Sequence, residues 1–154
     1  MDLQDPAAKK ILVYGYGNPG REDDGLGPLF IDSLEKSECP LESRIELHSS
    51  YQLNIEDALL VSGKDLVVFV DASREDIDGF SFREVQASSR MSFFTHGLDA
   101  GDVLGLARKL YNRRPAAYLL GIKGYSWGPV ESLTPGAQEN LQKALSFLLR
   151  ELAV

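Results

Sequence analysis

The chain has 154 residues, of which 44% are hydrophobic and 25% are charged, and its formal net charge at pH 7 is −7. This length and composition predict one globular domain over residues 1–154, long enough to bury a sizeable core. The acidic balance disfavours a nucleic acid or an anionic membrane as partner, because both attract basic surfaces. It is compatible with a cation or a basic peptide as ligand.

Cysteine usage and hydropathy predict a cytoplasmic protein. The single cysteine, Cys39, cannot form an internal disulfide, so nothing in the composition indicates an oxidising compartment. Residues 1–10 contain no apolar segment of the kind that signal peptides carry. The longest apolar run, Leu66–Val70, is far shorter than a membrane span.

Predicted strands and helices alternate along the chain. Strands are predicted at 11–16, 44–47, 65–71, 80–85 and 117–122. Helices are predicted at 24–36, 55–61 and 99–111 and from Pro135 onward, with Asn54, Asp99 and Thr134 as N-caps. The run Leu66–Val70 is typical of a strand buried on both faces, so the pattern predicts an α/β sheet with helices on both sides.

A glycine-rich loop follows the first predicted strand. Gly15, Gly17 and Gly20 form the G-x-G-x-x-G pattern that is typical of dinucleotide-binding loops. However, the carboxylates of Glu22-Asp23-Asp24 come next and would repel a pyrophosphate, and the second strand lacks an acid at its tip, His48-Ser49-Ser50. The loop is therefore predicted to present a carboxylate to a cation, with nucleotide binding as an alternative.

Three side chains are candidates for chemistry because they fall at the ends of predicted strands or in loops near them. Asp24 follows the first strand, Asp71 ends the central apolar strand, and His96 precedes a helix. Ligand sites in α/β sheets lie beyond the carboxyl ends of the strands. Two carboxylates and an imidazole suit a borderline divalent metal, although each residue alone also fits a structural role.

Other catalytic patterns are missing from the sequence. There is no G-x-S-x-G elbow and no H-E-x-x-H motif, and acidic neighbours disfavour Cys39 as a nucleophile. His48 is expected to be a structural residue or a rim residue rather than a ligand. Trp127 is expected to anchor a loop, with contact to a substrate as the alternative.

With these residues, the chain resembles the hydrogenase maturation proteases, the endopeptidases of nickel-iron hydrogenases. The resemblance rests on Ile11–Asn18, Asp23–Gly27, Leu66–Ala72, Thr95–Leu98 and Leu133–Pro135. The G-x-G-N loop followed by D-D-G-x-G is the specific part. Within that family, Tyr51–Ala58 resembles the branch that serves bidirectional, NAD(P)-linked hydrogenases.

The resemblance implies a three-layer α/β sandwich with a mostly parallel twisted sheet. It implies an endopeptidase, often classed as aspartic-type, that removes the C-terminal peptide of a nickel-loaded large-subunit precursor. The family pattern places its catalytic and metal-binding residues on Asp24, Asp71 and His96, and the first of these is Glu in some members. Either Asp71 or Asp23 is a candidate general base.

Substrate contacts are expected at Gly17, Asn18, Asp23, Gly25, Gly27, Thr95 and Gly97, where glycines would let the precursor backbone approach. Nickel is expected to arrive with the precursor, and other divalent metals are expected to occupy the site in vitro. A metal-dependent recognition module without catalysis is the other alternative.

Overall fold

The computed structural model describes residues 10–37, 44–89 and 97–152 of the chain. In this part of the chain the strands form one sheet in the order β2-β1-β3-β5-β4. The strands are β1 (Ile11–Tyr16), β2 (Ile45–Ser50), β3 (Leu66–Ser73), β4 (Phe80–Glu84) and β5 (Ala116–Lys123). Every pairing is parallel except that of the edge strand β4 with β5, which confirms the predicted, mostly parallel sheet.

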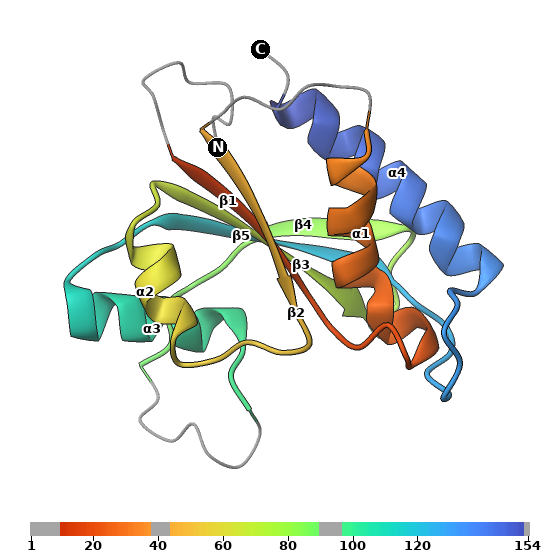
Figure 1. Cartoon of the computed structure of the whole chain (residues 1–154), viewed down its shortest axis with the longest axis horizontal. Helices are drawn as coiled ribbons and strands as arrows, with labels where there is room; N and C mark the ends of the chain where they lie inside the picture. The colour runs from red at the N-terminus through yellow and green to blue at the C-terminus, as the bar shows by residue number, and fades with distance from the viewer. Residues whose placement is uncertain (1–9, 38–43, 90–96, 153–154) are drawn as a thin grey trace.

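Helices cover both faces of this sheet. They are α1 (Leu26–Glu35), α2 (Asp57–Ser62), α3 (Ala100–Tyr111) and α4 (Pro135–Leu152), and a 3₁₀ turn η1 (Glu22–Gly25) precedes α1. Figure 1 shows α1 and α4 on one side of the sheet and α2 and α3 on the other. The predicted three-layer α/β sandwich is therefore confirmed.

The central strand β3 divides the core into two clusters. Val68 and Val70 pack in the cluster that includes α1 and α4. Val67 and Phe69 pack in the cluster that includes α3. All four side chains are fully buried, which explains the unbroken apolar run, because a central parallel strand has no solvent-facing side.

Several predicted boundaries differ from the structure by one to three residues, and two of these differences lie at the starts of helices. The helix predicted from Asp24 starts at Leu26, because the residues before it form η1. The prediction of Asn54 as the N-cap of α2 was wrong: the carboxylate of Asp57 instead accepts a hydrogen bond from the Asn54 backbone N–H at 2.8 Å. Asp57 lies inside the first turn and reaches back to the chain before the helix, as the acid of a capping box does, and within the described part of the chain no side-chain cap hydrogen bond is formed at the start of α2.

The other two predicted caps are confirmed. Asp99 caps α3 through a reciprocal capping box with Asp102. Thr134 precedes α4, and its hydroxyl accepts a hydrogen bond from the Ala137 N–H at 3.3 Å. These caps fix where the chain enters both helices, beside the carboxyl ends of the strands.

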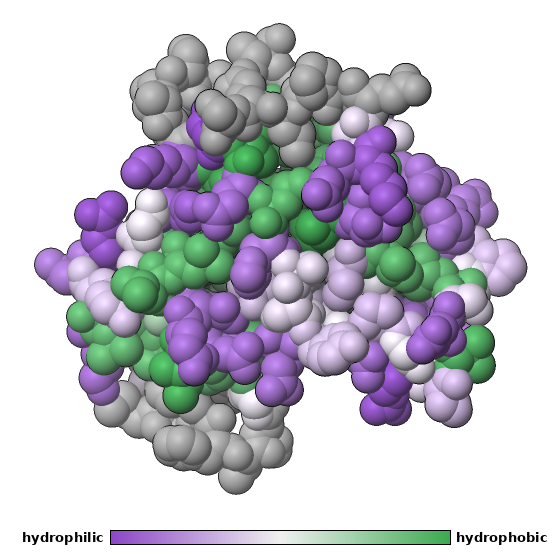
Figure 2. Space-filling model, viewed as in Figure 1, coloured by the Kyte–Doolittle hydropathy of each residue, from purple (hydrophilic) through white to green (hydrophobic). Residues whose placement is uncertain are grey.

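No helix within residues 10–37, 44–89 and 97–152 is both long and apolar enough to span a membrane. On the face shown in Figure 2, hydrophobic residues lie in several separate areas between hydrophilic ones.

Candidate active site

The strand order brings Asp24 and Asp71 together. β1 and β3 are adjacent and parallel, so their carboxyl ends reach the same edge of the sheet, toward the lower right of Figure 1. Asp71 lies near the end of β3, and Asp24 lies in η1, just after β1. Both line one pocket of about 380 Å³, so the structure joins two of the three side chains expected in the site.

Asp71 has an environment that favours its neutral form. Burial and the nearby charge of Asp24 raise the pKa of Asp71 to about 7, although hydrogen bonds from the Ala72 N–H and the Tyr16 hydroxyl oppose the shift. The Ala72 N–H donates to Oδ1 at 2.8 Å. A carboxyl group with this pKa can both accept and release a proton near neutral pH.

Asp24 is held by the loop that precedes it. Its Oδ2 accepts a hydrogen bond from the backbone N–H of Asn18 at 2.9 Å. The Asn18 side chain in turn accepts from the Gly20 N–H at 2.9 Å and so stabilises the turn. Asn18 therefore positions Asp24, and the amide that a pyrophosphate would need is already used by the carboxylate of the protein itself.

Asp23 occupies a different environment from its neighbour. It has no exposed surface. Its carboxylate accepts four hydrogen bonds, from the Tyr125 and Ser126 N–H groups and from the N–H and hydroxyl of Thr134, at 2.7–3.1 Å. Burial opposes ionisation of Asp23, but these donors outweigh it and lower its pKa. Asp23 therefore supports the site from beneath and, in this structure, is inaccessible to a substrate as contact or as general base.

Glu22 has a similar supporting role. It adopts a φ of 49°, and its Oε1 accepts hydrogen bonds from the Ser126 hydroxyl and the Gly128 N–H, both at 2.9 Å. Of the three successive carboxylates, two therefore fasten the β5–α4 loop, and Asp24 is the one that faces the pocket. The family pattern pointed to Asp24 as a ligand, but nothing in the sequence indicated that Glu22 and Asp23 would fasten this loop.

The glycines expected at the substrate serve internal packing where their surroundings are described. A Cβ on Gly17 would lie 2.0 Å from the carbonyl oxygen of Asp24, and Gly17 has a φ of +140°. A Cβ on Gly25 would lie 2.6 Å from Pro19, and one on Gly27 would lie 2.3 Å from the carbonyl oxygen of Tyr16. All three are buried, so they allow η1 and α1 to approach β1 rather than a substrate backbone to approach the protein.

Part of the expected site lies outside the described residues. This applies to Thr95 and His96, and also to Cys39. The adjacent Gly97 is exposed, has a φ of +73° and has nothing within 4 Å of a Cβ position. Among the described residues, no group of three or more acidic, histidine or cysteine side chains could hold a metal ion. The third ligand thus remains a prediction.

The structure adds Tyr16 to the site, which the sequence reasoning missed. Its hydroxyl hydrogen-bonds to Asp71, and burial together with the charge of Asp71 raises the pKa of the phenol. Strand alternation could have indicated this contact, because Tyr14 and Tyr16 share one face of β1. The pairing with Asp71, however, depends on the order of the strands.

A second pocket of about 430 Å³ adjoins the first. It shares Asp71, Arg83 and Leu119 with the first pocket and extends to Asp99 and Ala100 at the start of α3. We call the two pockets together the Asp71 groove. Its residues on β3 and β5 include Asp71 and Leu119, which lie on the α2–α3 face of the sheet.

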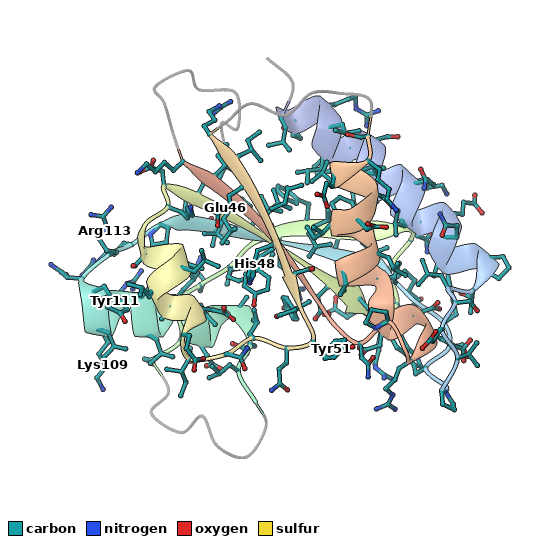
Figure 3. All side chains as sticks on the ribbon, viewed as in Figure 1. Glu46, His48, Tyr51, Lys109, Tyr111 and Arg113 are labelled. Carbon is teal, nitrogen blue, oxygen red and sulfur yellow. The ribbon has the colours of Figure 1, made fainter. Side chains whose placement is uncertain are left out.

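The other two side chains singled out from the sequence take separate places. His48 lies on β2, and its ring packs edge-on against buried Tyr14 with centroids 4.7 Å apart, so a structural role is supported (Figure 3). Trp127 lines the first pocket and stacks under Arg74. Trp127 therefore anchors the loop and is also available to a bound molecule.

Several solved structures share this fold. The hydrogenase maturating endopeptidase HybD from E. coli matches with a TM-score of 0.74 and 23% identity over 94% of each chain. The NiFe hydrogenase maturation protease HycI from Thermococcus kodakarensis matches with a TM-score of 0.73 and 22% identity over 96% of each chain. A hydrogenase 2 maturation peptidase from a Thaumarchaeota archaeon matches with a TM-score of 0.68 and 22% identity, over 94% of this chain and 99% of the other.

These likenesses establish the class of fold. No protein-family profile matches the chain, and no curated protein sequence matches it. The chain therefore has the fold found in hydrogenase maturation proteases, with two acidic residues at the carboxyl ends of its strands.

Proposed function

We propose that the protein is an endopeptidase that removes the C-terminal peptide from the nickel-loaded precursor of a nickel-iron hydrogenase large subunit. One observation carries the proposal. Asp24 and Asp71, expected as the acids that contact nickel, meet in one pocket of a chain that has the fold of HybD and HycI over 94–96% of its length.

In this proposal the precursor brings the nickel, and Asp24, Asp71 and His96 contact it. A cation there polarises the scissile carbonyl or acidifies an attacking water. As an alternative to contact with nickel, Asp71 acts as general base: without a bound cation its pKa of about 7 suits proton transfer near neutral pH, whereas Asp23 is buried and fully hydrogen-bonded. Without a precursor, other divalent metals bind the site weakly.

The partner is a hydrogenase large-subunit precursor in the cytoplasm. The segment Tyr51–Ala58, which resembles the branch serving bidirectional NAD(P)-linked hydrogenases, makes a precursor of that type the first substrate to test. The presence of Asp24 and Asp71 in one pocket supports the proposal of an aspartic-type peptidase.

The test is a processing assay followed by mass spectrometry. A nickel-loaded precursor should lose its C-terminal peptide, whereas the metal-free precursor should remain intact. Asp24→Ala should abolish the reaction without unfolding the protein. Asp32→Ala is the matched control, because Asp32 lies on the exposed side of α1 and pairs only with Lys36 at 3.0 Å.

Two outcomes would contradict the proposal. Rapid cutting of the metal-free precursor would show that cleavage does not depend on contact between nickel and these carboxylates, and their proposed role would be abandoned. Stable binding of the nickel-loaded precursor without release of a peptide would favour the recognition module over the peptidase.

A further inference from the structure

The Asp71 groove contains a stacked pair of side chains that the proposed reaction does not use. The guanidinium carbon of Arg74 lies 3.9 Å above the centroid of the Trp127 ring. Arg74 directly follows β3, and Trp127 lies in the β5–α4 loop. Both line the pocket that also contains Asp24 and Asp71, so a molecule bound at the two carboxylates lies next to this pair.

The ring of Trp127 is held in place from below. Gly124 has no side chain, and a Cβ there would lie 2.8 Å from the ring. The same loop is fastened by the buried carboxylate of Asp23, which accepts hydrogen bonds from the Tyr125 and Ser126 N–H groups at 2.7 and 3.1 Å. Trp127 is therefore a fixed surface rather than a loose side chain.

Arg74 is held on that surface with its hydrogen-bonding edge available. The ammonium group of Lys123 donates to the backbone carbonyl of Arg74 at 3.5 Å. The neighbouring Arg83 is paired with Glu75 at 3.2 Å, but no carboxylate among the described residues pairs with Arg74. Stacking uses the flat face of a guanidinium and leaves its N–H groups directed outward along the edge, where they match the two oxygens of a carboxylate.

The pocket lining thus carries groups of both charges. Asp24 and Asp71 suit a cation, while Arg74 supplies a positive charge without a partner in the described part of the chain. Of the two arginines in the pocket lining, Arg83 is paired with Glu75, and Arg74 is exposed and lies over Trp127. Its geometry selects an anion rather than an apolar side chain.

We propose that Arg74, stacked on Trp127, binds a carboxylate of the precursor segment that lies in the Asp71 groove beside the cut. This inference rests on the proposed function. The carboxylate is either an Asp or Glu side chain or the terminus of the precursor. The subsite orients the segment relative to Asp24 and Asp71, so it contributes to substrate selection and not to bond cleavage.

The first experiment needs no hydrogenase. Trp127 is the only tryptophan of the chain, so its fluorescence reports on this subsite directly. The full chain is titrated with three short peptides: one with a glutamate and both ends blocked, one with glutamine instead and both ends blocked, and the glutamine peptide with a free C-terminus. A saturable change in Trp127 fluorescence is expected with at least one carboxylate peptide and not with the fully neutral one. Comparing the two carboxylate peptides shows whether the subsite binds an acidic side chain or a C-terminal carboxylate.

Variants connect the signal to Arg74. Arg74→Gln should weaken binding about tenfold, because a charge-assisted hydrogen bond is lost, and Arg74→Lys should restore part of it. Arg108→Gln, at an exposed position on α3, is the matched control and should bind like the wild type. Equal binding by the wild type and Arg74→Gln, or tighter Arg74-dependent binding of inorganic phosphate than of either carboxylate peptide, would overturn the inference.

The second experiment uses the nickel-loaded precursor. Arg74→Gln should raise KM for processing about tenfold, and replacing the acidic residues of the precursor's C-terminal peptide by neutral ones should reduce that difference. If the wild-type protein binds the peptides but never cuts a precursor, the proposed function fails and the carboxylate subsite stands. If the wild-type protein cuts the precursor but shows no Arg74-dependent peptide binding, the proposed function stands and the carboxylate subsite fails.

Discussion

Adjacent residues in η1 have different physical roles. Asp23 is buried and accepts four hydrogen bonds, while Asp24 is partly exposed in the pocket and accepts one, from Asn18. A carboxylate with many donors is costly to remove, because its donors are left buried and unpaired. A partly exposed carboxylate can be replaced without that cost.

We therefore expect Asp23→Asn to lower the free energy of unfolding by about 3 kcal/mol and Asp24→Asn to change it by less than about 1 kcal/mol. The side-chain amide introduced by Asp23→Asn would direct its own N–H donors against the N–H groups of Tyr125 or Thr134. Denaturant titration of both variants measures the difference. Equal loss of stability in the two variants would refute the distinct roles.

The raised pKa of Asp71 predicts a pH-dependent stability. Its folded value of about 7 lies above the unfolded value of about 3.9, so the folded protein binds more protons between these values. Its contribution to stability is therefore full below about pH 4 and is lost as the pH rises toward 7. Asp71→Asn should raise the free energy of unfolding by on the order of 1 kcal/mol at about pH 8 and leave it nearly unchanged at about pH 4.

This measurement is made with a chelator present, so that no cation compensates the charge of Asp71. A stabilisation of the same size at both pH values would show that the asparagine side chain improves packing instead. Replacing Asp24 by asparagine should also lower the pKa of Asp71, because the charge of Asp24 contributes to raising it.

At the scale of elements, the close contact between β1 and α1 determines where Asp24 lies. Gly15 and Gly27 face each other, and a Cβ on Gly15 would lie 2.2 Å from the carbonyl oxygen of Gly27. This contact allows the helix to begin directly over the end of the strand. The glycines of the loop thus position the carboxylate instead of binding a phosphate.

Gly27→Ala should destabilise the protein by about 2–3 kcal/mol, because the new methyl group would meet the backbone carbonyls of Tyr16 and Val70 at 2.3 and 2.7 Å. Gly63→Ala is the control, since the nearest atom to a Cβ there is 3.9 Å away and its φ is −84°. Thermal unfolding of both variants provides the comparison. If the two variants unfold alike, the close β1–α1 contact is not required.

At the scale of the whole molecule, the sheet separates two ends of different chemistry. The carboxyl ends of β1 and β3 carry the acidic pocket. Lys109 and Arg113, at the C-terminal end of α3, lie at the opposite end of the sheet (Figure 3).

We expect that NAD and ATP at about 1 mM do not raise the melting temperature. A nucleotide present at 100 times its Kd would stabilise the folded protein by about 2.7 kcal/mol, so binding would be detected. The loop amide of Asn18 is already bonded to Asp24 at 2.9 Å, and the carboxylate repels phosphate. A rise in melting temperature with either nucleotide would contradict this expectation and revive nucleotide binding.

Much of this architecture could be predicted from local patterns. Strand periodicity predicted β1, and helix periodicity with the cap Asp99 predicted α3. The buried apolar run predicted β3 as the centre of the sheet. The meeting of Asp24 and Asp71 could be anticipated because both follow parallel strands, whose carboxyl ends share one edge. The start of α2 was misplaced, because Asn54 and Asp57 are both plausible caps until the position of the backbone is known.

The amino-acid sequence by itself determined the alternation of elements, the parallel sheet and the two acids at its edge, because these depend on the hydrophobic period and on strand polarity. Only the tertiary structure decided that Asp23, the neighbour of Asp24, is buried and fully hydrogen-bonded instead of lining the pocket. Asp23 and Asp24 are chemically identical, and their separation arises from the β5–α4 loop, about 100 residues later, whose N–H groups surround one of them. The pairing of Arg74 with Trp127 has the same origin, because contacts between distant segments depend on strand order and leave no local pattern.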